Sequence, residues 1–373
     1  MFFRPCPGDE RGDVGMDKLR VASRMGLFRF RMNGAGWEQA GEPAFLAQPV
    51  TAVLDDPRDG TLYAALRLGH FGCKMHRSDD GGASWLELPA PAYPASDAAD
   101  APSLDMIWTL VAGGADQPGL LWAGTLPGGL FISRDRGESW KLMESLWSRH
   151  ERERWFGGGY DHPGIHSVLV DPRDSRRITV GISCGGVWLS DNGGDTWEQG
   201  GHGLRADFLP PDQAMDPVSQ DPHLIAACRS DPDRVWCQHH CGIFVSSDRG
   251  RTFRELSGIR PSAFGFAVAV HPARPDHAWF APGVKDECRV PADGRLVVTR
   301  TTDGGGRFEQ LTDGLPARNC YDIIYRHALA CDATGDRLAM GSTTGNLWHS
   351  PDGGASWGLV SSTLPPIHQV AFA

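Results

Sequence analysis

The amino-acid sequence predicts an all-β fold, a seven-bladed β-propeller of four-stranded antiparallel blades. Three observations support this: a turn motif occurs six times, short strand-like segments recur around each copy, and the two ends of the chain carry complementary partial units. Glycine and proline make up 47 and 27 of the 373 residues and supply the turns that many short strands need. We expect residues 16–373 to form a single propeller and residues 1–15 a disordered arm.

The repeated motif has the order Ser/Thr, any residue, Asp/Asn, any residue, Gly, any residue, a residue that is usually Ser/Thr, then Trp/Phe. Its copies are residues 78–85, 133–140, 190–197, 246–253, 301–308 and 350–357, and their closing aromatic residues lie 49 to 57 positions apart. A short Asp or Asn side chain bonds its own backbone while glycine adopts a positive φ, so each copy is expected to form a tight turn. The seventh and eighth residues are then expected to belong to the strand that leaves the turn.

The segments around each turn also recur. An apolar segment ending in Asp-Pro, such as residues 167–172, precedes a short strand-like segment, such as residues 62–65. A Gly-apolar-aromatic segment ending in Ser then leads into the turn. Four short strands in about 50 residues are typical of a propeller blade.

The number of blades follows from the ends of the chain. Residues 18–40 carry Gly26, Phe28 and Trp37 at the spacing of the other units, and they supply the later strands of one more blade. The missing first strand is found in residues 367–372. One blade closed by both ends gives seven blades and removes exposed sheet edges, so residues 367–372 are predicted to pair with the strand near residues 19–24.

Charge and composition exclude several classes of partner. The net charge of −10 provides no positive surface for nucleic acid or anionic lipid. No apolar run reaches the length of a membrane span, and residues 1–15 lack the order of a secretory signal. Nine cysteines, an odd number, argue against a disulfide framework and fit a reducing compartment. We therefore expect a cytoplasmic protein with no nucleic-acid or membrane partner.

The six turn segments resemble the Asp-box, or BNR, repeat with consensus Ser-x-Asp-x-Gly-x-Thr-Trp. This repeat occurs in sialidases, sortilin-type receptors, xyloglucanases and photosystem II assembly factors. Asn192 and Arg307 each depart from the consensus at one position. The resemblance implies that the turns line one rim of the ring and that the functional pocket opens on the opposite rim. Because propellers carry many unrelated activities, the function must be argued from that pocket.

Seven histidines fall in the loops assigned to the opposite rim: His70, His162, His166, His223, His239, His240 and His368. Neutral imidazole is a common ligand of Zn²⁺, so we predict a divalent metal bound by His70, His162, His166 and His239, with no organic cofactor. Because His239 and His240 are neighbours on a strand end, their side chains diverge and at most one joins the cluster. The alternative is that each histidine is a hydrogen-bonded wall residue.

Glycoside hydrolysis requires paired carboxylates, and the long rim loops supply candidates. We predict Asp161 and Glu287 as catalytic residues, with Tyr160 and His162 beside them. The predicted substrate-binding residues are Arg67, Lys74, Trp155, Arg289 and Tyr321. The alternative for each acid is a solvated loop carboxylate.

The sequence leaves two narrower activities open. A sialidase would need three arginines, which Arg24, Arg67 and Arg289 can supply, and a tyrosine nucleophile, Tyr160 or Tyr321. The Arg-Ile-Pro motif typical of sialidases is absent from the sequence. In the second alternative Cys184 acts as a thiolate nucleophile beside His239.

We interpret the chain as an enzyme of hydrolase or lyase type that acts, with metal assistance, on a small polar or glycan-like substrate in the central funnel. The concentration of His, Trp and Tyr in long rim loops supports this interpretation, because a simple scaffold needs none of them. The alternative is a non-catalytic binding or assembly propeller with a protein partner.

Overall fold

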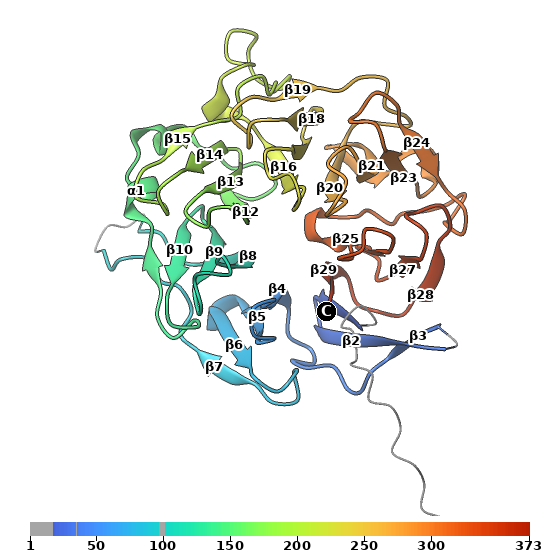
Figure 1. Cartoon of the computed structure of the whole chain (residues 1–373), viewed down its shortest axis with the longest axis horizontal. Coiled ribbons are helices and arrows are strands. Elements are labelled where there is room, and N and C mark those ends of the chain that lie inside the picture. The colour runs from blue at the N-terminus through green and yellow to red at the C-terminus, as the bar shows by residue number, and fades with distance from the viewer. Residues whose placement is uncertain (1–17, 35, 97–100) are drawn as a thin grey trace, which may run out of the picture.

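A computed structural model describes residues 18–34, 36–96 and 101–373. In these residues seven antiparallel sheets are arranged in a ring around a central channel (Figure 1). The predicted fold class, a seven-bladed β-propeller, is confirmed. The predicted arm at residues 1–15 lies outside the described residues. None of the described helices has the length and apolar character that a membrane crossing requires.

Each blade is named here by its place in the ring. Blade 1 contains β29 (Ile367–Phe372), β1 (Lys18–Ser23), β2 (Gly26–Asn33) and β3 (Gly36–Gln39). Blade 2 contains β4 (Val50–Asp55), β5 (Leu62–Arg67), β6 (Cys73–Ser78) and β7 (Leu86–Leu88). Blade 3 contains β8 (Met106–Ala112), β9 (Leu121–Leu126), β10 (Leu130–Ser133) and β11 (Lys141–Leu142). Blade 4 contains β12 (Gly164–Val170), β13 (Ile178–Ser183), β14 (Gly186–Ser190) and β15 (Glu198–Gln199).

The remaining blades follow the same order, with one addition. Blade 5 contains β16 (Pro222–Ala227), β17 (Val235–His239), β18 (Gly242–Ser246) and β19 (Arg254–Glu255). Blade 6 contains β20 (Gly265–Val270), β21 (Ala278–Lys285), β23 (Val298–Thr301) and β24 (Glu309–Leu311), and β22 (Cys288–Pro291) pairs with β21 beside this path. Blade 7 contains β25 (Leu329–Cys331), β26 (Leu338–Gly341), β27 (Leu347–Ser350) and β28 (Gly358–Ser361). Short helices are α1 (Glu144–Trp147), η2 (Gly69–Phe71), η3 (His150–Arg154), η4 (Pro217–Ser219), η5 (Ala292–Gly294) and η6 (Arg326–Ala328).

The ring closes as predicted. Strand β29 pairs antiparallel with β1, with Phe372 opposite Leu19 and Ile367 opposite Ser23. The first and last described strands therefore share one blade, in which β29 is the first strand and β1 the second, and this pairing closes the ring.

The six repeated turns connect the third and fourth strands of their blades. In the first copy Ser78 donates to Asp80 Oδ1 at 2.7 Å, and the backbone N–H and hydroxyl of Ser84 donate to the same carboxylate at 2.9 and 2.6 Å. These hydrogen bonds lower the pKa of Asp80. Gly82, with φ of 88°, donates its N–H back to Ser78 and closes the turn. One detail differs from the prediction: Ser84 and Trp85 precede β7 (Leu86–Leu88) instead of belonging to it, and the Asp80 carboxylate holds Ser84 in the turn.

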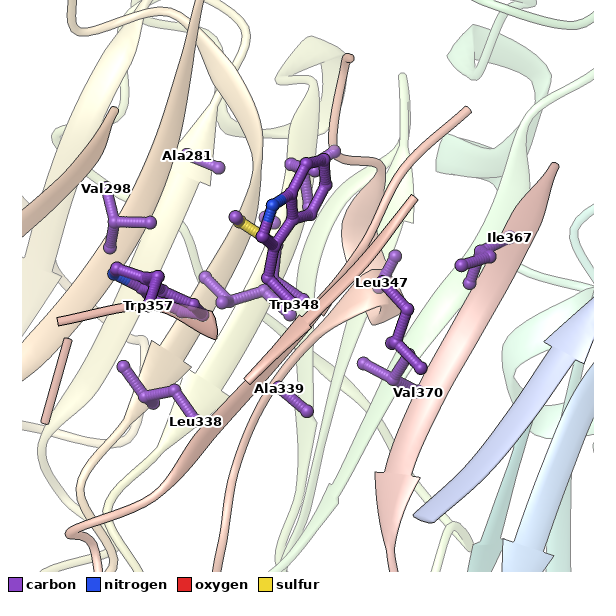
Figure 2. Close-up of a cluster of buried hydrophobic side chains, with 14 of the residues drawn as sticks. Ala281, Val298, Leu338, Ala339, Leu347, Trp348, Trp357, Ile367 and Val370 are labelled. Atoms are coloured by element: carbon purple, nitrogen blue, oxygen red, sulfur yellow. The ribbon is translucent and has the colours of Figure 1, made fainter. Parts of the chain in front are cut away.

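The core lies between adjacent blades. Figure 2 shows Trp357, the closing aromatic of the last turn, between Val298 of blade 6 and Leu338 of blade 7. The same cluster continues through Trp348 to Val370 of blade 1. Each aromatic at such a position thus joins two blades, and burial of this apolar surface stabilises the ring.

Candidate functional site

The first strand of most blades is bulged where it meets the central channel. Pairing shifts register between Val50 and Ala52, Ile107 and Thr109, Ile165 and Ser167, Pro222 and Leu224, Gly265 and Val268, and opposite Ser23 in β29. A bulge leaves one residue unpaired and re-aims its side chain. The residues skipped in this way include Thr51, Trp108, His166, His223, Phe266 and His368, and all of these except His166 line one central cavity.

Blade 7 departs from this pattern. Its first strand is short, and η6 takes the place of the bulge, with Arg326 at φ of 27°. This left-handed conformation is uncommon for a side chain other than glycine and is found where surrounding contacts impose it. Arg326 Nε donates to the carbonyl of His223 at 2.9 Å, and His327 Nε2 lies 2.8 Å from the carbonyl of His166. The segment thus reaches across the ring to blades 4 and 5.

The cavity has a volume of about 920 Å³ and opens in the middle of the ring. Its aromatic lining consists of Trp108, Phe156, Tyr160, Phe208, Phe266 and Tyr325. Its charged lining consists of Arg24, Arg67, Asp105, Asp221, Asp286, Glu287, Arg289 and Arg326. Aromatic walls with a few convergent charged groups are typical of a site for a small polar ligand.

The arginines of the cavity differ in how they are neutralised. Arg67 pairs with Asp105 at 2.9 Å and Arg289 with Asp286 at 2.6 Å. Arg326 has no carboxylate oxygen within 4.0 Å in the described part of the chain. Its guanidinium instead lies over the rings of Trp108 at 4.5 Å and Phe266 at 5.6 Å. Burial lowers the pKa of Arg326 and the charge of Asp221 opposes that effect. A guanidinium stays charged in proteins, so Arg326 faces the cavity as a positive group that forms no salt bridge with a described carboxylate.

A buried acid with two imidazoles lies beside Arg326. Asp221 Oδ1 accepts hydrogen bonds from Ser183 Oγ at 3.0 Å and from the backbone N–H of Cys184 at 3.1 Å. Its other oxygen, Oδ2, lies 3.4 Å from His223 Nε2 and 3.3 Å from His240 Nδ1. Burial alone would raise the pKa of Asp221, but the histidines outweigh it and hold that pKa well below its usual range.

Both imidazoles of this cluster are held in place by neighbouring groups. His223 Nδ1 donates to the carbonyl of Gly265 at 2.6 Å, which leaves Nε2 facing Asp221 Oδ2. The His223 ring stacks on Phe266 at 4.5 Å, and His240 packs edge-on against Phe208 at 4.9 Å. Among the described His, Cys, Asp and Glu residues, only Asp221, His223 and His240 bring three potential ligand atoms within 4.8 Å of one another.

Four of the predicted site residues line the cavity: Arg67, Tyr160, Glu287 and Arg289. Tyr160 stands edge-on to Trp108 at 5.3 Å. Glu287 is exposed and lies 3.4 Å from Lys285, and hydrogen bonds from its own backbone and from Lys285 lower its pKa. Arg24, named with Arg67 and Arg289 for the sialidase alternative, also lines the cavity.

The other predicted catalytic and substrate-binding residues do not line it. Asp161 and His162 are exposed, and so is Tyr321, at 68%. Lys74 pairs with Glu87 at 2.7 Å. Trp155 is buried in the core against Trp188, because its loop folds back onto blade 4.

The four predicted metal ligands are not brought together among the described residues. His166 is buried, with its ring nitrogens 2.8 Å from Ser167 Oγ and 2.7 Å from the carbonyl of Pro222. Both ring nitrogens of His239 lie 3.1 Å from backbone amide nitrogens, and burial lowers its pKa to about 3. His70 is exposed on η2 and packs on Phe71. Of the neighbouring pair it is His240, not His239, that reaches the cluster, because successive side chains of a strand face opposite sides.

The alternative nucleophile is not activated. Cys184 is buried, and burial first, then the charge of Asp221, raises the pKa of its thiol. A thiol in this setting stays protonated and is a poor nucleophile. The nitrogens of His239, its proposed partner, already face backbone amides.

Sequence reasoning missed Asp221 and Arg326 as site residues. Asp221 and Arg326 both lie just before the first strand of their blade, and each has a histidine within two residues: Asp221-Pro222-His223 and Arg326-His327. Their position could have identified them, because the residues before the first strand reach the central cavity in several blades. The bulges that turn the side chains inward leave no mark in the sequence.

The geometry defines a class of protein, a seven-bladed propeller with a ligand-sized central cavity, and comparison with known proteins agrees on the fold. No family profile matches the chain. A stretch of 79 residues is 28% identical to an oligoxyloglucan-reducing end-specific xyloglucanase of Emericella nidulans, and it covers 21% of this chain and 9% of that enzyme.

Two solved structures share the architecture. An ancestral GH74 enzyme superposes with a TM-score of 0.58 at 16% identity, over 80% of this chain and 36% of that one. YCF48 bound to D1 peptide superposes with a TM-score of 0.54 at 18% identity, over 88% of both chains. At these identities the likeness concerns the fold alone. The chain spans about a third of the GH74 enzyme and is close in length to YCF48.

Proposed function

We propose that this protein is a propeller hydrolase of the Asp-box group that acts on a small, polar, glycan-like substrate carrying an anionic group. One observation carries the proposal: two kinds of charged group with little exposure, Arg326 and the Asp221 cluster, face the same cavity. Charged groups with little exposure lower stability unless they are paired, so they are retained where they serve binding or chemistry.

Arg326 is the proposed anchor for the anionic group. Its guanidinium stacks between aromatic rings and has no carboxylate partner among the described residues, so a carboxylate or phosphate of the substrate can pair with it in a geometry that arginine favours. Trp108 and Tyr160 provide apolar faces for a sugar ring beside it.

The Asp221 cluster is the proposed water-activating group. Asp221 accepts hydrogen bonds from Ser183 Oγ and from the backbone N–H of Cys184, and both contacts favour the carboxylate, which can accept a proton or orient an imidazole. The positive charge of Arg326 lies close enough to Asp221 to affect it electrostatically, and it would stabilise negative charge that develops on the substrate.

Acidic and neutral sugars test the anchor. Glucuronate should raise the melting temperature of the wild-type chain, whereas glucose at the same concentration should not. Arg326→Met should abolish the glucuronate effect, and Arg31→Met, which removes an exposed arginine paired with Glu38, should retain it. Equal responses to both sugars, or a full response in Arg326→Met, would contradict the proposal.

Turnover is tested separately with 4-nitrophenyl glycosides of uronic acids and of neutral sugars. We expect release of nitrophenol from the acidic substrates and a loss of at least about 100-fold in kcat with Asp221→Asn. The comparison with YCF48 bound to a peptide supports a second candidate, a non-catalytic peptide-binding propeller. Peptide binding without hydrolysis of any ester or glycoside would favour that candidate.

A further inference from the structure

We propose that Asp221, His223 and His240 bind one Zn²⁺ ion, with an open coordination position that faces the central cavity. This inference rests on the proposed function and deepens it, because it names the group that would activate water. The three residues belong to blade 5, on β16 and at the two adjoining strand ends. They differ from the four histidines that the sequence analysis named.

The distances within the cluster suit a metal ion. Ligands about 2.05 Å from a tetrahedral Zn²⁺ stand about 3.3 Å from each other. The Asp221 Oδ2 atom lies 3.4 Å from His223 Nε2 and 3.3 Å from His240 Nδ1. Two of the three ligand-to-ligand distances therefore already match a coordination sphere, and the third, between the two imidazole nitrogens, is within 4.8 Å.

The hydrogen-bond pattern points to a cation at the same place. A carbonyl oxygen only accepts, so the contact of His223 Nδ1 with Gly265 fixes the proton on Nδ1. In the neutral imidazole, His223 Nε2 then directs a lone pair at an oxygen of Asp221, and a carboxylate oxygen also carries only lone pairs. Two acceptors at 3.4 Å repel each other unless a cation or a shared proton lies between them.

The surroundings orient these ligands as outer residues do in metal sites. Ser183 Oγ and the N–H of Cys184 bind Asp221 Oδ1 and leave Oδ2 to the ion. The His223 imidazole donates to a carbonyl, the usual partner of a ligating histidine. Two imidazoles and one carboxylate favour Zn²⁺ over Mg²⁺ or Ca²⁺, which prefer oxygen ligands.

The cavity supplies the remaining position. Three protein ligands with one open position are typical of catalytic zinc, which lowers the pKa of a bound water molecule. Because Asp221, His223 and His240 all line the cavity, that position is accessible to water or to an anionic group of the substrate. Arg326 is then placed to bind the other end of the same anion.

Zinc binding can be measured without any substrate. The full chain, free of any affinity tag, is stripped with EDTA, dialysed, and titrated with ZnCl₂ by calorimetry. We expect one Zn²⁺ per chain, and visible absorption bands of low-coordinate Co²⁺ when Co²⁺ replaces it. Loss of an outer partner typically weakens metal binding 10- to 100-fold, so Asp221→Asn and His240→Gln should each weaken it by more than about 100-fold.

The matched control is His368→Gln, which removes a cavity histidine whose Nδ1 lies 2.9 Å from the carbonyl of Val50. It should bind Zn²⁺ like the wild type, and circular dichroism confirms that each variant is folded. A folded wild type that binds no Zn²⁺, or binding that survives both ligand variants, would overturn the inference. If Zn²⁺ fails to bind while glucuronate still stabilises the chain through Arg326, the metal proposal fails alone. If Zn²⁺ binds and no acidic sugar does, the metal site stands and the proposed function fails.

Discussion

Two regions of this propeller are repeated in different ways. The outer turns are the six repeated turns between the third and fourth strands, and the inner strand ends are the bulged starts of the first strands. The outer turns repeat residue type and hydrogen bonding, and each satisfies its own polar groups, as Ser78, Asp80 and Ser84 do. The inner strand ends repeat only a bulged geometry, and the residue at the bulge changes from Thr51 to Trp108 to His223 around the ring. Constant residues thus maintain the scaffold, and variable residues in a constant geometry form the site.

The largest effect is expected at the outer turns, from the aromatic residue that closes them. Trp197 is 5% exposed, packs between blades and donates to Ser145, so Trp197→Ala should lower the free energy of unfolding by about 3–5 kcal/mol. Trp140 is only half-buried, and Trp140→Ala should cost roughly half as much. Urea unfolding of both variants measures the difference. Equal losses would mean that exposure of the ring does not decide its contribution.

The next largest effect is a pH dependence of stability at the interface between blades 7 and 1, where His349 lies. Burial, and secondarily Arg337, lowers the pKa of His349 from 6.5 to about 4 in the folded chain. The unfolded chain therefore takes up the proton first, and stability that is complete above pH 6.5 is lost as the pH falls toward 4. At pH 5 this single residue should reduce the free energy of unfolding by about 2 kcal/mol.

His349→Phe removes the group that takes up the proton and keeps an aromatic ring against Trp37 and Phe372. Its unfolding free energy should fall less between pH 7.5 and pH 5 than that of the wild type. Parallel pH profiles of His349→Phe and the wild type would contradict the assignment.

At the inner strand ends a substitution is expected to raise the stability of the folded chain, not to lower it. Arg326→Met removes a charge that has no carboxylate partner within the described residues and keeps an apolar stem on Trp108. The variant should be more stable than the wild type by about 0.5–2 kcal/mol, because residues retained for function are often not optimal for stability. Thermal melts without ligand measure this. A clear loss of stability would show that Arg326 serves mainly to attach η6 to β16.

The smallest effect is expected where one outer turn departs from the others. Asp303 accepts a hydrogen bond from the backbone of Arg307 but lacks the hydroxyl contact that Asp80 receives from Ser84. Arg307→Thr supplies that hydroxyl and should raise the melting temperature slightly without altering binding in the cavity. Arg31→Thr, made at an exposed arginine, is the control. An equal rise in its melting temperature would show that the effect does not come from a hydroxyl contact with Asp303.

Much of the fold was predictable because its signals are local. The turn at residues 78–85 is specified by the residues within it, and the pairing of residues 367–372 with the first strand followed from counting incomplete units. The candidate site was predicted in part: Arg67, Tyr160, Glu287 and Arg289 line the cavity. Asp221 and Arg326 were missed, and His239 was chosen in place of His240.

The sequence by itself determined the ring of seven blades, the closure by both ends and the six repeated turns. A unit of four short strands that recurs about every 50 residues is typical of propeller blades, and the two partial units complete one more blade. Only the tertiary structure decided which side chains meet in the channel. Asp221 and Arg326 are 105 positions apart and belong to different blades, and they come together because a bulge and a strained turn each re-aim one strand end. One residue of slip in a strand reverses the face of every side chain after it, so that choice depends on packing around the whole ring.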